Sequence, residues 1–292
     1  MRAGNLVYVG LLLCVTAIWG WTFVVVKDAI AEYPVLPFLA IRFLIAAAVM
    51  ALLVRRLPSR RTLAVGVLIG LPLAAGYLLQ TFGLRYTSPG HAGLITGLFF
   101  VFTPLLDRLF GVALRPRTLV AVLLALLGTV LLSGGADASI GVGDALVVGC
   151  AVCFALQIVL LSHRPQGLSA AELTLVQLAT CAFLFSAGGA SQLRLPSPGV
   201  WAALLITGVF ASALAFLIQT WVQTHLSASR TALVLASEPA WALFFSVLLT
   251  GQRLGVIEAA GAALVVAAIL GHELAPAGEV GGRLGGGTHR GG

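Results

Sequence analysis

The sequence predicts an all-α membrane protein whose ten transmembrane helices form two inverted five-helix repeats around a central cavity. Three observations predict this fold: the composition, ten long apolar segments, and an internal repeat. Of the 292 residues, 60% are hydrophobic and only 9% are charged, and the mean hydropathy is +1.06. A soluble domain carries about 25% charged residues. Most of the outer surface of this chain must therefore face lipid.

Ten segments are long and apolar enough to cross a bilayer, which takes about 20 residues of helix. They occupy residues 6–26, 35–54, 63–83, 91–111, 118–134, 144–162, 170–190, 200–221, 231–251 and 255–272. Their apolar residues are continuous rather than alternating, which favours helices over the strands of a barrel. The first segment follows Arg2 and lacks a cleavage signal before Lys27, so we interpret it as a retained helix and not as a signal peptide.

The internal repeat has a spacing of 139 residues and maps residues 6–134 onto 144–272. It places Gln80 on Gln219 and Ser88 on Ser227. Because each repeat holds an odd number of helices, the two repeats must have opposite orientations in the membrane. We expect a first repeat in residues 1–136 and a second in residues 137–273. Residues 274–292 are Gly-rich and polar, and we expect them to form a disordered cytoplasmic tail.

The basic residues outside the apolar segments indicate the orientation. On the side of the N-terminus lie twelve arginines: Arg2, Arg55, Arg56, Arg60, Arg61, Arg108, Arg115, Arg117, Arg164, Arg230, Arg283 and Arg290. The opposite side has only Lys27, Arg85, Arg194 and Arg253, and Arg42 lies within a segment. Basic loops stay in the cytoplasm. The bias predicts a multi-pass protein of the bacterial inner membrane with both termini in the cytoplasm.

Polar and aromatic side chains within the apolar segments are the candidates for a substrate-binding site. Each polar group costs free energy in lipid, so it should face a cavity or a partner. The candidates are Trp19, Arg42, Tyr77, Gln80, Thr96, Gln157, Gln177, Gln219, Glu238 and Trp241. The aromatic rings would hold an apolar or cationic substrate by their faces. Alternatively they pack helices together or anchor the protein at the membrane interface, and Trp19 and Trp21 are predicted to lie near a helix end.

Two charged candidates have two interpretations each. Arg42 would bind an anionic group of the substrate, or it would extend to the outer lipid headgroups. Glu238 would be a protonatable or amine-binding group in the transport pathway. Alternatively it would be a neutral side chain bonded to backbone at a kink, because Pro239 removes a backbone donor.

Other functional classes find little support in the sequence. Cys150 and Cys153 form a C-x-x-C pair, but no accompanying His or second Cys pair suggests a metal, so we expect neither metal nor cofactor. Gly141 to Asp144 matches the G-x-G-D of intramembrane aspartyl proteases. Asp107, the only candidate for the second carboxylate, is predicted at the inner end of segment 91–111, whereas Asp144 is predicted at the outer end of segment 144–162. The basic residues are not clustered with aromatic residues as in nucleic-acid-binding proteins.

Several short motifs resemble the EamA-type family of the drug/metabolite transporter superfamily, and the resemblance extends to about Gly271. They are Ile18-Trp19-Gly20, Val26-Lys27, Ile41-Arg42-Phe43, Leu84-Arg85-Tyr86-Thr87-Ser88, Ala92 to Leu98, Phe102 to Leu106, Gly143 to Leu146, His225-Leu226-Ser227, Ala232-Leu233 and Glu238-Pro239. The resemblance implies a ten-helix carrier of two inverted repeats, similar to exporters of amino acids and related metabolites. The Gly-Glu-Arg turn frequent in the family is absent, since the chain has Gly111 to Arg115 and Gly251-Gln252-Arg253, so no role of that Glu transfers.

The functional hypothesis is a secondary transporter that exports a small organic metabolite, such as an amino acid, by alternating access. Aromatic rings, amides, one Arg and one Glu suit a zwitterion, and a proton is a possible coupling ion through Glu238. Drugs, organic cations and nucleotide or sugar derivatives are alternative substrates, although sugar phosphates would require several buried cations and only Arg42 qualifies. An intramembrane enzyme and a non-transporting membrane protein or channel are the other classes. The sequence predicts no oligomeric state.

Overall fold

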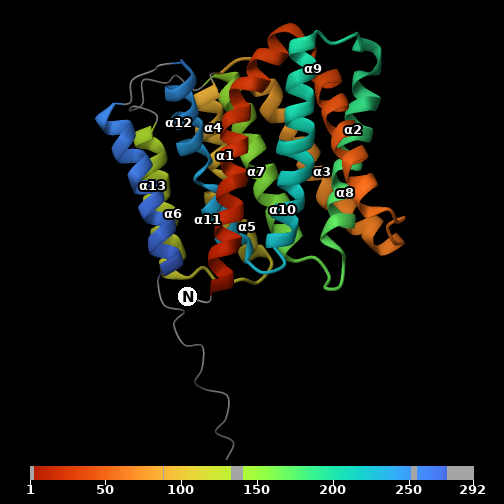
Figure 1. Ribbon diagram of the computed structural model, residues 1–292. Coiled ribbons are helices and arrows are strands. Elements are labelled where there is room, and N and C mark those ends of the chain that lie inside the picture. Colours follow the sequence, from red (N-terminus) through yellow and green to blue (C-terminus); the bar gives the residue numbers. More distant parts are fainter. Residues whose placement is uncertain (1–2, 88, 133–140, 251–254, 275–292) are drawn as a thin grey trace, which may run out of the picture.

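The computed structural model describes residues 3–87, 89–132, 141–250 and 255–274, and these residues form a bundle of helices (Figure 1). The first repeat contains α1 (Ala3–Glu32), α2 (Val35–Val54), α3 (Arg60–Gly83), α4 (Pro89–Gly97), α5 (Phe99–Leu109) and α6 (Pro116–Leu132). The second repeat contains α7 (Val142–Ser162), α8 (Ala170–Gly189), η1 (Ala190–Gln192), α9 (Pro198–Leu205), η2 (Ile206–Leu214), α10 (Ala215–Val222), α11 (Ala228–Leu235), α12 (Glu238–Thr250) and α13 (Val256–Leu274). The expected boundary near residue 136 and the tail lie outside the described residues.

The predicted all-α membrane fold is confirmed. Among the described residues, seven helical stretches are long and apolar enough to cross a membrane, and two shorter apolar helices cover Pro116–Leu131 and Ala259–His272. The stretches Ala92–Leu109 and Pro198–Val222 each join shorter elements, and the latter contains the π-helix η2. The remaining predicted segment, 231–251, is divided between α11 and α12. All ten predicted segments are therefore helical in their described parts.

The first helix is longer than the sequence predicted. Its apolar run ends at Val26, but α1 continues to Glu32 and stops before Pro34. The ammonium group of Lys27 donates a hydrogen bond to the carbonyl oxygen of Thr87 (3.0 Å), beyond the end of α3. Because of this extension, Trp19 lies in the middle of the helix, and its expected place near a helix end was wrong.

The fourth helix of each repeat is interrupted at the same place. The first interruption is at Leu98, between α4 and α5, and the second is at Ala236 and Ser237, between α11 and α12. The 139-residue spacing places Leu98 on Ser237. Pro239 is the second residue of α12, a position where a missing N–H removes no helical hydrogen bond. The sequence predicted a kink within one helix at Pro239, but in the structure a new helix begins there.

Helix packing follows the two repeats. The equivalent helices α2 and α8 pack together at one edge of the bundle, and α6 and α13 pack together at the other (Figure 1). Between these edges, α3 packs on α7, and the equivalent α10 and η2 pack on α1. Such exchange of equivalent contacts is the pattern of a two-fold relation between inverted repeats. The centre of the bundle is therefore the interface between the repeats.

Gly20 allows α1 to approach α12 closely. A Cβ atom at this position would lie 2.7 Å from the backbone nitrogen of Ala242 and 2.9 Å from Cβ of Trp241. Close helix approach at small residues is a main source of stability in membrane bundles.

We expect Gly20→Ala to destabilise the protein by about 1–3 kcal/mol, because a rigid backbone atom would have to move. The measurement is the midpoint of thermal unfolding in detergent. Gly10→Ala is the matched control on the same helix, since a Cβ atom there meets nothing within 4 Å. Equal midpoints for the two variants would contradict the prediction.

Candidate functional site

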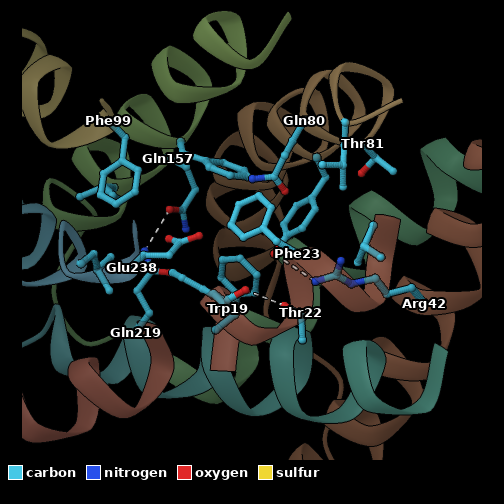
Figure 2. A pocket seen from close by; sticks show the side chains of 17 residues that line it. Trp19, Thr22, Phe23, Arg42, Gln80, Thr81, Phe99, Gln157, Gln219 and Glu238 are labelled. Atoms are coloured by element: carbon cyan, nitrogen blue, oxygen red, sulfur yellow. Dashed lines mark hydrogen bonds between the residues drawn. The ribbon is translucent and has the colours of Figure 1, made fainter. Parts of the chain in front are cut away.

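A cavity lies at the interface between the two repeats and holds about 620 Å³ of empty space, part of it open to solvent. Helices α1, α2, α3 and α5 of the first repeat line it together with α7, α10, α11 and α12 of the second (Figure 2). The lining residues are Trp19, Thr22, Phe23, Val26, Arg42, Tyr77, Gln80, Thr81, Leu84, Phe99, Phe154, Gln157, Ile158, Phe216, Gln219, Leu235 and Glu238.

Equivalent positions of the two repeats face this cavity in pairs. The 139-residue spacing pairs Gln80 with Gln219, and all four residues of two further pairs, Tyr77 with Phe216 and Trp19 with Ile158, also line it. The two charged residues break the symmetry. By the 139-residue spacing, the uncharged Phe99 is the first-repeat equivalent of Glu238, and the uncharged Cys181 is the second-repeat equivalent of Arg42. The repeats thus supply the position of the cavity, while single residues supply its charge.

Arg42 lies at one end of the cavity and is only 3% exposed (Figure 2). Its Nε donates to Oγ of Ser212 (2.9 Å) and its Nη2 to the hydroxyl of Tyr77 (3.3 Å). The guanidinium carbon also lies 4.7 Å from the centre of the Tyr77 ring. Among the described residues no carboxylate pairs with Arg42. Extension to the lipid headgroups is therefore contradicted, and the guanidinium faces the cavity with hydrogen-bonding capacity left.

The π-helix η2 positions both Arg42 and Trp19. Ser212 belongs to η2, and the indole Nε1 of Trp19 donates to the carbonyl oxygen of Ala211 in the same helix (2.8 Å). A π-helix shifts the backbone hydrogen-bond pattern and often occurs at functional sites. Gly208, also in η2, lies against α2, where an added Cβ atom would be 3.0 Å from the carbonyl oxygen of Arg42.

Glu238 lies at the other end of the cavity, with Gln157 and Gln219 beside it (Figure 2). It is 3% exposed and is the first residue of α12. Within the described residues its carboxylate has no hydrogen bond and no ion pair. The expected alternative, a hydrogen bond to backbone at a kink, is thus not observed.

Seven of the ten predicted site residues line the cavity: Trp19, Arg42, Tyr77, Gln80, Gln157, Gln219 and Glu238. The other three lie behind it. Thr96 accepts a hydrogen bond from Gln80 (3.1 Å), and Gln177 accepts one from Gln157 (3.0 Å). Trp241 packs against Phe244 and Phe245 instead.

Sequence reasoning missed Ser212 and the phenylalanines of the wall, which are Phe23, Phe99, Phe154 and Phe216. Serine and phenylalanine are ordinary residues of membrane helices, so composition and position along the chain do not distinguish these from their neighbours. Only the 139-residue spacing, which pairs Phe216 with Tyr77 and Phe99 with Glu238, could have drawn attention to two of them.

Polar contacts join helices at the end of the bundle where α1 begins, and that of His163 with Asp107 also joins the two repeats. Nε2 of His163 lies 2.6 Å from Oδ1 of Asp107, and Nε2 of Gln223 donates to Oγ of Ser162 (2.8 Å). None of these four residues lines the cavity, whereas Val26 and Leu84, toward the other end, do. Asp144 accepts hydrogen bonds from Thr87 and from the backbone of Gly141, so Asp107 and Asp144 have separate partners and do not form a catalytic pair.

Within the described ranges no group of three or more His, Cys, Asp or Glu side chains is arranged to hold a metal ion. Cys150 and Cys153 are free cysteines, the first buried and the second partly buried. The cavity therefore offers hydrogen bonds, two opposite charges and aromatic faces as its means of recognition.

Comparisons with known proteins agree with this architecture. The model of the EamA-like transporter family matches residues 6–134 and again residues 141–272. An uncharacterized transporter of Archaeoglobus fulgidus is 32% identical over 264 residues, which cover 89% of this chain and 83% of that protein. The uncharacterized inner membrane transporter YedA of Escherichia coli is 27% identical over 282 residues, or 92% of each chain. A crystal structure with a TM-score of 0.73 and 20% identity covers 90% of this chain and 97% of its own, which shows the shared fold.

Proposed function

This chain belongs to the EamA-like transporter family, and from that premise we propose that it exports a small amphipathic metabolite, such as an amino acid, across the bacterial inner membrane. Membership makes it a multi-pass membrane transporter. The proposal adds the substrate class, the direction and the orientation, with both termini in the cytoplasm. It also places the two repeats at residues 1–136 and 137–273 and a cytoplasmic tail at residues 274–292.

The observation that carries the substrate class is the distribution of charge in the cavity. Arg42 lies at one end and Glu238 at the other, with Trp19 between them (Figure 2), and the ring of Tyr77 also lines the cavity. A zwitterion with an apolar side chain matches all three features, because its carboxylate, its ammonium group and its side chain each find a complementary surface. A polyanionic substrate would place negative charge next to the carboxylate of Glu238, and the two would repel each other.

Alternating access explains how such a site would release its substrate on one side. Both repeats contribute helices to the walls of the cavity, so rocking one repeat against the other would change which end is open. The contact of Asp107 with His163 joins the two repeats at the end where α1 begins. In the proposed orientation that end faces the cytoplasm, and this contact would break when the cavity opens there.

The test is counterflow exchange in proteoliposomes that contain the full chain. Labelled amino acids, organic cations and nucleotide sugars are offered in turn to vesicles loaded with the unlabelled compound. We expect saturable exchange of at least one amino acid with an apolar side chain. Exchange of organic cations alone would replace the amino-acid proposal, and no exchange by inserted, folded protein would remove it.

A further inference from the structure

Four buried glutamines form a continuous hydrogen-bonded chain beside the Glu238 end of the cavity. Gln177 accepts from Nε2 of Gln157 (3.0 Å), and Gln157 accepts from Nε2 of Gln219 (3.1 Å). The same Nε2 of Gln219 donates to Oε1 of Gln223 (3.1 Å). Each of the four side chains is at most 4% exposed. The chain belongs to the second repeat alone, since Ile18, Phe38 and Leu84 occupy the equivalents of Gln157, Gln177 and Gln223.

Two backbone carbonyls determine the orientation of every amide in this chain. Nε2 of Gln177 donates to the carbonyl oxygen of Leu173 (3.3 Å), and Nε2 of Gln223 donates to that of Ile158 (2.9 Å). A carbonyl oxygen can only accept, so neither amide can be reversed. Gln157 must then donate to Gln177, and Gln219 must donate both to Gln157 and to Gln223. The assignment of oxygen and nitrogen at Gln219 follows from its neighbours.

The consequence is an acceptor without a partner. Both N–H groups of Gln219 are used, and its Oε1 is buried with no hydrogen bond. A buried polar atom of this kind costs free energy unless a ligand or water satisfies it. Glu238, which lies beside it in the wall of the cavity, has no cation partner among the described residues. This end of the cavity therefore presents two acceptors, one of which carries a negative charge when ionised.

We infer that Gln219 Oε1 and the carboxylate of Glu238 form a subsite for a primary ammonium group of the transported molecule. Such a group brings three N–H donors and one positive charge, which is what these two acceptors lack. A water molecule would supply donors without charge, and a quaternary ammonium would supply charge without donors. Gln157 and Gln223 act as positioning residues that hold the Gln219 oxygen in place. The inference rests on the proposed function in that the ligand is the transported molecule.

The first experiment changes the ligand and leaves the protein intact. The probes are phenylethylamine and its N,N,N-trimethyl derivative, which carry the same charge and ring but differ in N–H donors. Binding to the purified full chain in detergent is measured by tryptophan fluorescence, since Trp19 lines the cavity. We expect the trimethyl probe to bind about tenfold more weakly. Equal affinities, or no binding of the primary amine, would overturn the inference without any variant having to fold.

The second experiment locates the discrimination in the protein. Gln219→Leu should lower the ratio of the two dissociation constants clearly below the wild-type value, because one of the two acceptors is gone while the carboxylate of Glu238 stays. Gln223→Leu should reduce the ratio partly, since the Gln219 amide loses one of the two acceptors that orient it. Gln192→Leu is the matched control, because Gln192 is an exposed glutamine of η1 outside the cavity, and it should retain the tenfold ratio. If Gln219→Leu kept the tenfold ratio of dissociation constants, the discrimination between the two probes would come from another part of the protein.

The outcomes separate this inference from the proposed function. If amino acids exchange in vesicles but the wild type binds both probes equally, the ammonium subsite fails and transport stands. If the wild type prefers the primary amine but no amino acid exchanges, the subsite stands and the amino-acid substrate fails.

Discussion

Arg42→Ala should reduce kcat/KM for exchange of a carboxylate-bearing substrate by about 10- to 100-fold, because a buried charged hydrogen bond contributes about 1.5–3 kcal/mol. The loss should depend on the substrate. Phenylalanine should be affected strongly, and phenylethylamine, which has no carboxylate, only weakly. The measurement is the ratio of the two substrates' kcat/KM values in wild type and variant. This dependence distinguishes lost recognition of an anion from general damage to the fold.

Three further variants test the role of Arg42: a conservative substitution of Arg42 itself, removal of one of its contacts, and removal of an arginine elsewhere. Arg42→Lys should also lose most activity, since an ammonium group cannot reach Ser212 and Tyr77 with the geometry of the planar guanidinium. Ser212→Ala removes one contact that orients the guanidinium and should raise KM about two- to fivefold. Arg56→Ala removes an equal charge from an exposed position and should have no effect. If Arg42→Ala lowered transport of both substrates equally, Arg42 would serve structure and not recognition.

Glu238→Gln should abolish accumulation driven by a pH gradient while counterflow exchange continues at a reduced rate. Glutamine keeps the shape of the side chain but cannot bind or release a proton, so only the coupled step is lost. The assay compares uphill uptake with exchange in the same vesicles. This prediction tests the hypothesis, drawn from the sequence, that a proton is the coupling ion and acts through Glu238, which lies in the cavity without a protein partner among the described residues.

Asp28→Asn is the matched control for Glu238, because Asp28 is an exposed acid of α1 outside the cavity. It should leave both activities as in the wild type. Continued pH-driven accumulation by Glu238→Gln would remove Glu238 from the coupling mechanism and leave it as part of the substrate subsite alone.

Hydropathy predicted the helices well, but it did not predict where two of them break. Leu98 lies in an apolar stretch with Phe99 and Phe100, and the interruption there has no helix-breaking residue at its centre. The second interruption has Pro239 nearby, yet this proline begins a helix and does not bend one. Both interruptions face the interface between the repeats, where packing of α1 against α12 at Gly20 and of Gly97 against Pro239 selects the backbone course.

The candidate site was predictable as a set of residue types but not as an arrangement. Polar groups are rare in these helices, so their presence alone singled out Arg42, Gln219 and Glu238. Their roles depended on partners far away in the chain. Arg42 meets Ser212 across 170 residues, and Gln157 meets Gln219 across 62. Thr96 and Gln177 do not line the cavity, and each accepts a hydrogen bond from a glutamine that does.

The sequence by itself determined that this is a helical membrane protein with a repeated architecture, because hydropathy is a local property and the bilayer demands long apolar helices. It also identified the polar residues whose burial in lipid costs free energy and which therefore needed partners inside the bundle. The tertiary structure decided which of those residues meet. That choice depends on how each helix is rotated and how closely it packs, and small residues such as Gly20 and Gly208 control both. The separation of Arg42 from Glu238 across one cavity is a product of that packing.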